Sequence, residues 1–366
     1  MAADEPDSSN PGMSTGDTTR SGTNNGRRVK LTITDIAKMA GVSKKTVSRV
    51  INHSGLVRDE TRERIMKIVE EHGYQPDPQA RALALRRSTL IALISNQPNP
   101  QYIVDIQGGI LTGMASTPYQ LVIRPCDRSS PTLHDDICDI VQHQKLFGVI
   151  LTPSISEDDE LIGRLRQIGC PYVRIAAVSL DTPDNMIETH DYVGAAEAAR
   201  HIASLGHTRI AHIHGPDTFL SAAERLRGFR VGLAEYGMKI EPQYLMKGGY
   251  TFESGMECGK QLLALDEPPT AVFAGNDEMA VGVYQAVRQA GLRVPDDLSI
   301  VGFDDAPIAT RIWPKLTTVR LPIVQMGRIA AELLISNHDR MAMEPPAATS
   351  VMPSLVVRES AGKPRA

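Results

Sequence analysis

The chain has 366 residues, a length that suits two or three domains better than one. Hydrophobic residues make up 42% and charged residues 22% of it, as in soluble globular proteins, and no apolar run approaches the roughly 18–20 residues that cross a bilayer. The four cysteines form no C-x-x-C pair, and no hydrophobic block opens the chain. We therefore expect neither a disulfide framework nor a secretory signal nor a membrane span, and favour a cytoplasmic protein.

The formal net charge of −4 is distributed unevenly along the chain. Residues 27–87 carry fourteen Lys and Arg against seven Asp and Glu, whereas the 26 residues before them have a net charge of −3 and the remainder one of −8. A short basic segment on an acidic body predicts a small nucleic-acid-binding module joined to a domain with another task. The alternative is a basic face that is simply solvated. The order of residues within the segment decides between these two interpretations.

The first ninety residues divide into three parts. Residues 1–29 are rich in Ser, Thr, Gly and Asn and poor in aliphatic residues, so we expect a disordered tail. Residues 30–76 contain three short helical patterns, which end at Tyr74-Gln-Pro-Asp-Pro78 because each proline disfavours helix in the residue before it. Residues 77–90 briefly resume helical spacing and link the basic module to the body.

Within the basic module, two helical patterns flank a glycine turn. Thr32 and Asp35 suit the start of the first helix, Gly41 permits the turn that ends it, and Ser43 can cap the second. The apolar residues that face each other across the turn are Ile36, Ala37, Ala40, Val47, Val50 and Ile51. The side chains left on the exposed face of the second helix are Lys44, Lys45, Ser48 and Arg49. This pattern predicts a helix-turn-helix whose second helix reaches base edges and phosphates in the major groove.

From Leu90 onward short apolar runs alternate with amphipathic stretches. The runs predict strands at 90–94, 120–123, 148–151, 172–175, 210–213, 271–273, 300–303 and 354–357. Helices are expected at 102–116, 131–144, 157–168, 192–205, 222–236, 253–265 and 277–290. Such alternation predicts parallel sheets covered by helices, and about 270 residues are too many for one small sheet. We therefore expect an α/β body of two Rossmann-like lobes with a cleft between them.

Polar side chains follow several of these runs, where the carboxyl ends of the strands would border the cleft. Asn276 and Asp277 follow one run, Asp304 and Asp305 another, and Arg225 lies beyond a third. Carboxylate, amide and guanidinium groups can together hydrogen-bond vicinal hydroxyls, and aromatic rings can stack on a sugar. The structural alternatives are a helix cap for Asp277 and a turn residue for Asp305.

The run T-x-x-D-I-A-x-x-A-G-V-S-x-x-T-V-S-R-V-x-N resembles the DNA-binding signature of the LacI/GalR family of bacterial transcription regulators. The resemblance continues through Ala80-Arg-Ala-Leu83 and most of the body, and leaves out only residues 1–29. It implies that the second helix reads the major groove and that a hinge helix around 80–83 pairs in the minor groove, with Leu83 wedged between base pairs. An ordinary interdomain linker is the alternative for that hinge. The DNA-binding residues that the resemblance implies are Thr32, Thr34, Ser43, Lys44, Lys45, Thr46, Ser48, Arg49, Asn52, Tyr74, Ala80 and Leu83.

For the body, the resemblance implies an effector domain of the periplasmic-binding-protein type. Its first lobe would comprise residues 91–190 and 323–336, and its second lobe residues 191–322 and 337–360. The effector-binding residues that it implies are Tyr102, Arg225, Tyr250, Asn276 and Asp304. One departure removes a polar contact, since Ala176 stands where many members of the family have an aspartate.

These observations predict a homodimeric repressor that binds double-stranded operator DNA and is released by a small sugar. Two alternatives stay open: a regulator that needs a corepressor such as a purine to bind DNA, and a solute-binding protein with the same two lobes. No G-x-S-x-G, H-E-x-x-H or P-loop motif occurs, so we expect no enzyme activity and no cofactor. His212-x-His214 lacks further ligands at a suitable spacing, so we expect no metal site.

Overall fold

The structure, a computed structural model, describes residues 31–51, 57–72, 74, 88–339 and 342–365. The chain divides into two compact units, Met1–Pro76 and Asp77–Ala366. The expected tail at 1–29 and most of the expected hinge, including Ala80 and Leu83, lie outside the described residues, as does Asn52. Within the described part, no helix is both long enough and apolar enough to cross a membrane.

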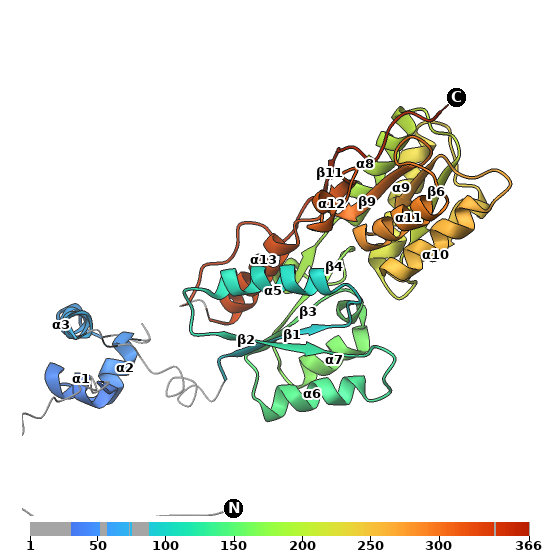
Figure 1. Cartoon of the computed structure of the whole chain (residues 1–366). Coiled ribbons are helices and arrows are strands. Elements are labelled where there is room, and N and C mark those ends of the chain that lie inside the picture. Colours follow the sequence, from blue (N-terminus) through green and yellow to red (C-terminus); the bar gives the residue numbers. More distant parts are fainter. Residues whose placement is uncertain (1–30, 52–56, 73, 75–87, 340–341, 366) are drawn as a thin grey trace, which may run out of the picture. The chain divides into compact units, whose positions relative to one another are not determined.

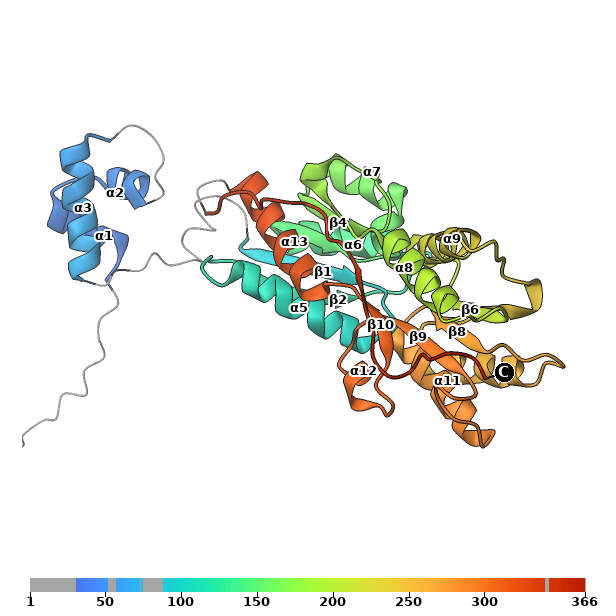
Figure 2. The ribbon, with the colours of Figure 1, turned by 90° about the horizontal axis from the view of Figure 1, so that it is seen from above.

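The first unit contains the helices α1 (Ile33–Ala40), α2 (Lys44–Ile51) and α3 (Asp59–Glu71), shown in Figure 2. The expected start of α1 is confirmed, because the Thr32 N–H and hydroxyl both donate to Asp35 Oδ2, at 2.9 and 2.6 Å. Gly41 ends α1 with φ 65°, a left-handed conformation that a side chain would strain. The core of this unit consists of Ile36, Ala37, Ala40, Val47, Val50 and Ile65. The helix-turn-helix predicted from the sequence is therefore confirmed.

The first lobe of the second unit is built on a parallel sheet with strand order β2-β1-β3-β4-β5. Its strands are β1 (Leu90–Ser95), β2 (Gln120–Pro125), β3 (Gly148–Leu151), β4 (Tyr172–Ala176) and β5 (Met186–Glu188). Its helices are α5 (Pro100–Met114), α6 (Leu133–His143), α7 (Asp159–Gln167) and α13 (Ile323–His338). The α5–α13 pair covers one face, and α6 and α7 cover the other (Figure 1). Parallel strands buried on both faces read as continuous apolar runs, which is why the sequence revealed most of them.

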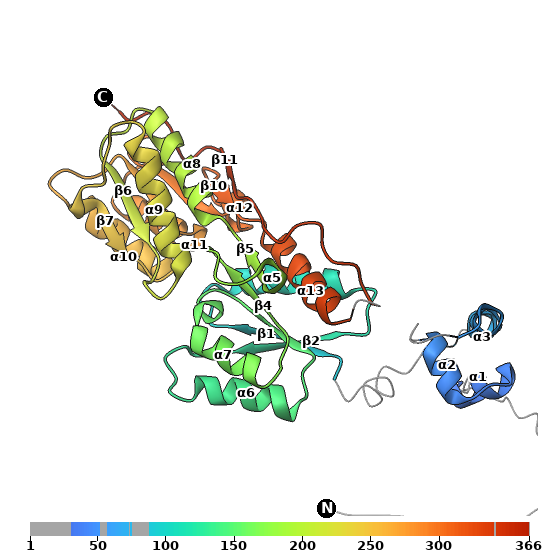
Figure 3. The same cartoon turned by 180° about the vertical axis from the view of Figure 1, so that it is seen from behind.

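The second lobe has strand order β11-β10-β9-β8-β6-β7, in which only β11 runs antiparallel to its neighbour. Its strands are β6 (Ile210–His214), β7 (Leu245–Lys247), β8 (Ala271–Ala274), β9 (Ser299–Asp304), β10 (Thr317–Arg320) and β11 (Ser354–Val356). Its helices are α8 (Asp191–Ser204), α9 (Leu220–Ala234), α10 (Phe252–Leu263), α11 (Asp277–Gln289) and the short α12 (Ile308–Arg311). One face is covered by α8 and α9 and the other by α10 and α11 (Figure 3). The short strands β5, β7 and β10 are absent from the sequence prediction.

The chain passes between the lobes after β5, after β10 and again between α13 and β11. The sequence assigned all of residues 337–360 to the second lobe, and this assignment needs a correction at its start. Glu188 of β5 pairs with Ser350, and its backbone bonds Thr349 and Val351. The chain leaving α13 thus first completes the edge of the first sheet beside β5, and crosses to the second lobe only afterwards.

Candidate functional site

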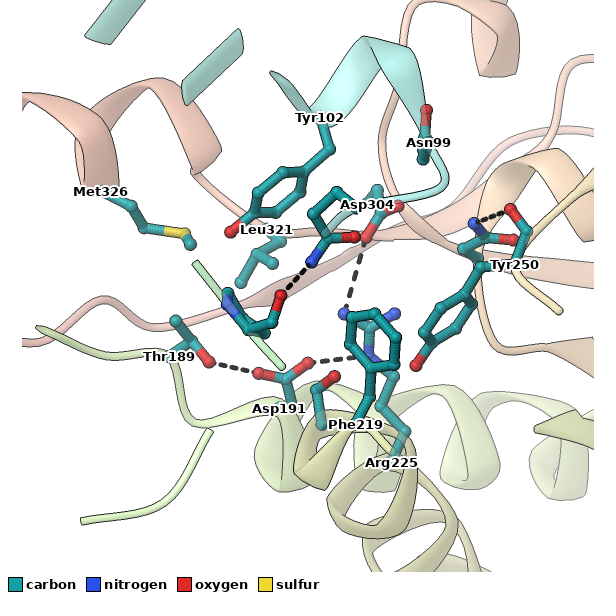
Figure 4. A pocket seen from close by; sticks show the side chains of 14 residues that line it. Asn99, Tyr102, Thr189, Asp191, Phe219, Arg225, Tyr250, Asp304, Leu321 and Met326 are labelled. Atoms are coloured by element: carbon teal, nitrogen blue, oxygen red, sulfur yellow. Dashed lines mark hydrogen bonds and ion pairs between the residues drawn. The ribbon is translucent and has the colours of Figure 1, made fainter. Parts of the chain in front are cut away.

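A cleft lies between the two lobes, at the carboxyl ends of both sets of parallel strands. All five effector-binding residues predicted from the sequence line it: Tyr102, Arg225, Tyr250, Asn276 and Asp304. The other described residues around it are Gln97, Asn99, Pro153, Thr189, Asp191, Phe219, Ser221, Leu321 and Met326. Figure 4 shows that the first lobe contributes uncharged side chains such as Tyr102, while the charged groups converge from the second lobe.

Arg225 projects from α9 into the cleft, where only 6% of it is exposed. Its Nε donates to Asp191 Oδ1 at 2.7 Å, one Nη donates to the Gly275 carbonyl, and the other Nη lies 3.6 Å from Asp304 Oδ1. Its flat guanidinium also stacks over the Phe303 ring, 3.7 Å from the ring centroid. Burial alone would lower the pKa of Arg225, but Asp191 and its other anionic neighbours outweigh this effect and raise it. The guanidinium is therefore a fixed positive charge.

Asp304 stands at the end of β9 with φ 113°, a conformation that non-glycine residues rarely adopt. Its carboxylate is buried, and its only recorded partner within the described chain is the Arg225 guanidinium at 3.6 Å. Burial raises the pKa of Asp304 to about 7, and nearby Asp191 adds to this rise while Arg225 opposes it. The strained backbone thus holds a weakly paired carboxyl group at the cleft, where it can accept a ligand hydroxyl.

Asn276 and Asp277 both have structural roles. A helix cap was the structural alternative for Asp277, but Asn276 is the N-cap of α11, accepting from the Met279 N–H at 2.9 Å. The Asn276 side chain also donates to the Tyr250 carbonyl at 3.1 Å. Asp277 instead joins the loop after β9 to strand β10, by accepting from the Ala306 N–H and the Thr318 hydroxyl. Asn276 lines the cleft, but its amide is already engaged on both sides.

Tyr102 and Tyr250 form aromatic walls on opposite lobes. Tyr102, on α5, is buried, and its hydroxyl has no hydrogen-bond partner among the described residues. Tyr250 adopts φ 61° and packs against Gly215, where an added Cβ would lie 2.1 Å from the tyrosine ring. Glycine at 215 is therefore what lets the Tyr250 ring reach the cleft. A buried hydroxyl without a hydrogen-bond partner costs free energy. The Tyr102 hydroxyl therefore favours the binding of a ligand that can hydrogen-bond to it.

Two contacts from the first lobe close the cleft over the start of α9. Glu157 Oε2 accepts from the Leu220 N–H at 3.0 Å, and an Arg128 Nη donates to the Thr218 carbonyl at 2.7 Å. No side chain near α9 in sequence caps it, since its N-cap residue is Phe219. Burial raises the pKa of Glu157 to about 6, although the Leu220 N–H and Arg128 partly oppose the rise. The helix that carries Arg225 is thus capped from the opposite lobe.

In the first unit, the exposed side of α2 carries Lys44, Lys45 and Arg49. No ion pair is recorded for these three within the described chain, so their charges face solvent. Ser43 accepts from the Thr46 N–H at 3.1 Å, and the two hydroxyls lie 2.9 Å apart, so both belong to the cap of α2. The remaining described candidates are Thr32, which precedes α1, the α1 residue Thr34, the α2 residue Ser48, and Tyr74, which packs on the core of this first unit, the headpiece.

The sequence missed the residues that hold the charged cluster together. Asp191 is absent from the predicted effector-binding residues, although it pairs with Arg225 and accepts from the Thr189 hydroxyl. The Asp191–Arg225 pair spans 34 residues, and no local pattern signals such a pair. The cap at the start of α5, where Asn99 accepts from the Gln101 N–H, had a recognisable Asn-Pro signal. Ala176, where the family often has aspartate, is fully buried.

Comparison with known proteins gives two family matches along the chain. Residues 32–77 match the family of bacterial regulatory proteins of the lacI type, and residues 199–361 match the periplasmic-binding-protein-like domain. A curated relative, the HTH-type transcriptional regulator DegA of Bacillus subtilis (strain 168), is 36% identical over 82% of this chain and 89% of its own.

Two solved structures resemble the chain over nearly its whole length. A complex of the transcriptional regulator CelR with cellobiose has a TM-score of 0.67 at 30% identity and covers 90% of this chain and 99% of that one. The lac repressor dimer bound to operator and the anti-inducer ONPF has a TM-score of 0.69 at 29% identity, covering 90% and 98%. Both the headpiece and the two-lobed body therefore have counterparts in proteins of known architecture.

Proposed function

Because the chain belongs to the LacI family of bacterial regulatory proteins, we propose that it represses transcription at an operator and leaves that operator when a saccharide enters the cleft. The family makes the chain a DNA-binding transcriptional regulator rather than an enzyme. The observation that carries the saccharide part is the cleft itself, where Arg225 and Asp304 meet the aromatic walls Tyr102 and Tyr250. Such a regulator works in the cytoplasm, where its DNA lies.

The chemistry of the cleft suits a polyhydroxylated ring. The Asp304 carboxylate can accept a hydroxyl, and the Tyr102 hydroxyl can replace its missing hydrogen bond with one to the ligand. Tyr250 offers a ring face on which the apolar side of a sugar can stack. Cellobiose occupies the related regulator CelR, and a saccharide is the ligand class that we assign to this cleft.

The DNA-binding half of the proposal rests on α2. Lys44, Lys45 and Arg49 face solvent without counter-ions in the described chain, as phosphate- and base-contacting side chains do before DNA arrives. A homodimer would present two such helices to a near-palindromic operator. The related lac repressor binds its operator as a dimer. The roles of Thr32, Thr34, Asn52 and Tyr74, and of the hinge residues Ala80 and Leu83, belong to the same proposal.

A ligand can release the operator only if it binds one lobe arrangement more tightly than the other. The interlobe contacts of Glu157 and Arg128 with the start of α9 give the closed arrangement its own set of bonds. A saccharide that touches Tyr102 on one lobe and Asp304 on the other would shift the balance between open and closed lobes. The lobes would pass this shift to the segment that joins the body to the headpiece.

Fluorescence anisotropy on a labelled fragment of the gene's own upstream DNA tests the proposal. The protein is titrated at two salt concentrations, because phosphate contacts make operator affinity fall by orders of magnitude between about 50 and 200 mM salt. A panel of sugars and purines is then added. Release by one sugar is the expected result. Tighter DNA binding with a purine would indicate a corepressor instead of a saccharide inducer. A lack of any specific DNA binding would contradict the proposed repressor function.

A further inference from the structure

The cleft holds more negative than positive charge. Among the described residues that line it, the charged ones are Asp191, Arg225 and Asp304, so two carboxylates face one guanidinium. Asp191 lies at the start of α8, is 1% exposed and takes its bond from Arg225 Nε. This leaves Asp304 as the carboxylate that faces an incoming ligand (Figure 4).

Arg225, the one cation among the described residues that line the cleft, has a carboxylate beside two of its three nitrogens. Its Nε bonds Asp191, one Nη bonds the Gly275 carbonyl, and the other lies 3.6 Å from Asp304. The Phe303 ring covers one of its flat faces at 3.7 Å. The Nη near Asp304 makes no hydrogen bond at this distance, so an anionic ligand group that approached it would stand beside the Asp304 carboxylate.

The surroundings of Asp304 oppose a second negative charge. Among the described residues, Arg225 of α9 is the cation within 4 Å of its carboxylate, while Asp191 of α8, Asp105 of α5, and Asp277 and Glu278 of α11 act on it as negative charges. The phenols Tyr102 and Tyr250 flank the same space. Because burial raises the pKa of Asp304 to about 7, its carboxyl gains a full charge only above neutral pH. A like charge placed beside a buried carboxylate is unfavourable, whereas a hydroxyl can donate to it.

We propose that Asp304 sets the charge selectivity of the cleft, which admits neutral sugars and excludes sugar acids and sugar phosphates. This inference rests on the proposed saccharide function and narrows its ligand class. A neutral sugar keeps every contact of the Asp191–Arg225–Asp304 cluster and adds a hydroxyl donor to Asp304. A sugar acid that shares all other hydroxyls meets the same contacts and adds an unpaired buried anion.

Isothermal titration calorimetry of the full chain against matched ligand pairs tests the inference. The probes are glucose with glucuronate and galactose with galacturonate, together with cellobiose and ribose as further neutral sugars. At about pH 8 we expect the neutral member to bind on the order of 100-fold more tightly than its acid, since a like charge costs several kcal/mol and 1.4 kcal/mol is a factor of ten. The ratio should shrink towards pH 6, where Asp304 takes up a proton.

Asp304→Asn removes the charge with almost no change of shape, and asparagine tolerates a positive φ. In this variant we expect the acid to bind within a few-fold of the neutral sugar and the pH dependence of the ratio to vanish. Asp305→Asn is the matched control, because that neighbouring carboxylate pairs with Arg320 and Arg358 and is absent from the described lining of the cleft. It should leave the ratio unchanged.

Three results would overturn the inference. An acid that binds as tightly as its neutral partner at pH 8 would refute the charge selectivity but leave the saccharide function standing. A ratio that survives in Asp304→Asn would refute the role of Asp304. Binding of no sugar, neutral or acidic, would overturn the saccharide function and the inference with it.

Discussion

Arg49 and Arg225 are the same side chain in opposite surroundings. Arg49 lies on the exposed side of α2 in the headpiece, and no ion pair to it is recorded within the described chain. Arg225 lies on α9 in the cleft, is 6% exposed and touches two carboxylates, a carbonyl and an aromatic ring. The positive charge of Arg49 in the headpiece therefore stays available to a ligand, whereas that of Arg225 in the cleft is neutralised by carboxylates of the same chain.

This difference follows from the ligands that the two regions bind. DNA is a polyanion with condensed counter-ions, and a free cation gains affinity by releasing them. A small uncharged ligand brings no such charge, so a free buried cation in the cleft would only have to be desolvated. Inside the cleft the arginine instead bonds Asp191 and lies beside Asp304, the acceptor that we propose meets the ligand. Substitution of each arginine separates these two uses.

Removal of the buried arginine should have the largest effect. Arg225→Ala leaves Asp191 and Asp304 buried without their cation, and breaking such a pair costs about 3–5 kcal/mol. We expect the free energy of unfolding in urea to fall by that amount and sugar binding to be lost. Arg227→Ala is the control on the same helix, since its side chain is 59% exposed and pairs with Glu224. It should cost less than about 1 kcal/mol, and an equal loss in both variants would contradict the contrast.

Removal of the exposed arginine should affect DNA binding alone. Arg49→Ala should lower operator affinity by about 1–3 kcal/mol, the range for one base-reading side chain, and should leave urea unfolding and sugar binding unchanged. Lys67→Ala on α3 is a suitable control, because the lysine side chain is 77% exposed and its one ion pair, to Glu71 at 4.0 Å, is a surface pair within the described chain. Operator anisotropy measures both variants. Wild-type affinity in Arg49→Ala would show that α2 is not the reading helix.

The headpiece could be predicted from the sequence because its signals are local. The Thr32–Asp35 cap, the Gly41 turn and the Ser43 cap each involve residues within three or four positions of one another. The apolar runs of the body revealed its longer parallel strands in the same way. The strands β5 and β7 have three residues each and end in Glu188 and Lys247, so neither forms an apolar run.

The cleft could be predicted only as a set of candidate residues. The residues at strand ends gave Arg225, Asn276 and Asp304, but not how they are bonded. Asp191 meets Arg225 across 34 residues, so the pair arises from the packing of α8 beside α9. Glu157 reaches Leu220 across the lobes in the same way. Such contacts depend on tertiary structure, which neither residue type nor spacing encodes locally.

Glu157 provides the smallest and most specific test of the contrast, because this buried carboxylate accepts from the Leu220 N–H at 3.0 Å and has Arg128 only at 4.0 Å. Burial raises its pKa from 4.5 to about 6, while the Leu220 N–H, Arg128 and Arg174 oppose the rise and Asp191 favours it. The folded protein therefore binds the proton more tightly than the unfolded chain, and the contribution of Glu157 to stability falls as pH rises from about 4.5 to 6.

Glu157→Gln keeps an acceptor for Leu220 but cannot titrate, so the difference in unfolding free energy between variant and wild type should change by at most about 2 kcal/mol across that window. Glu160→Gln, whose side chain is 64% exposed, is the control in the same region. A Glu157→Gln profile parallel to that of the wild type would mean that the carboxylate is solvated, and that the lobes do not close over α9 in solution.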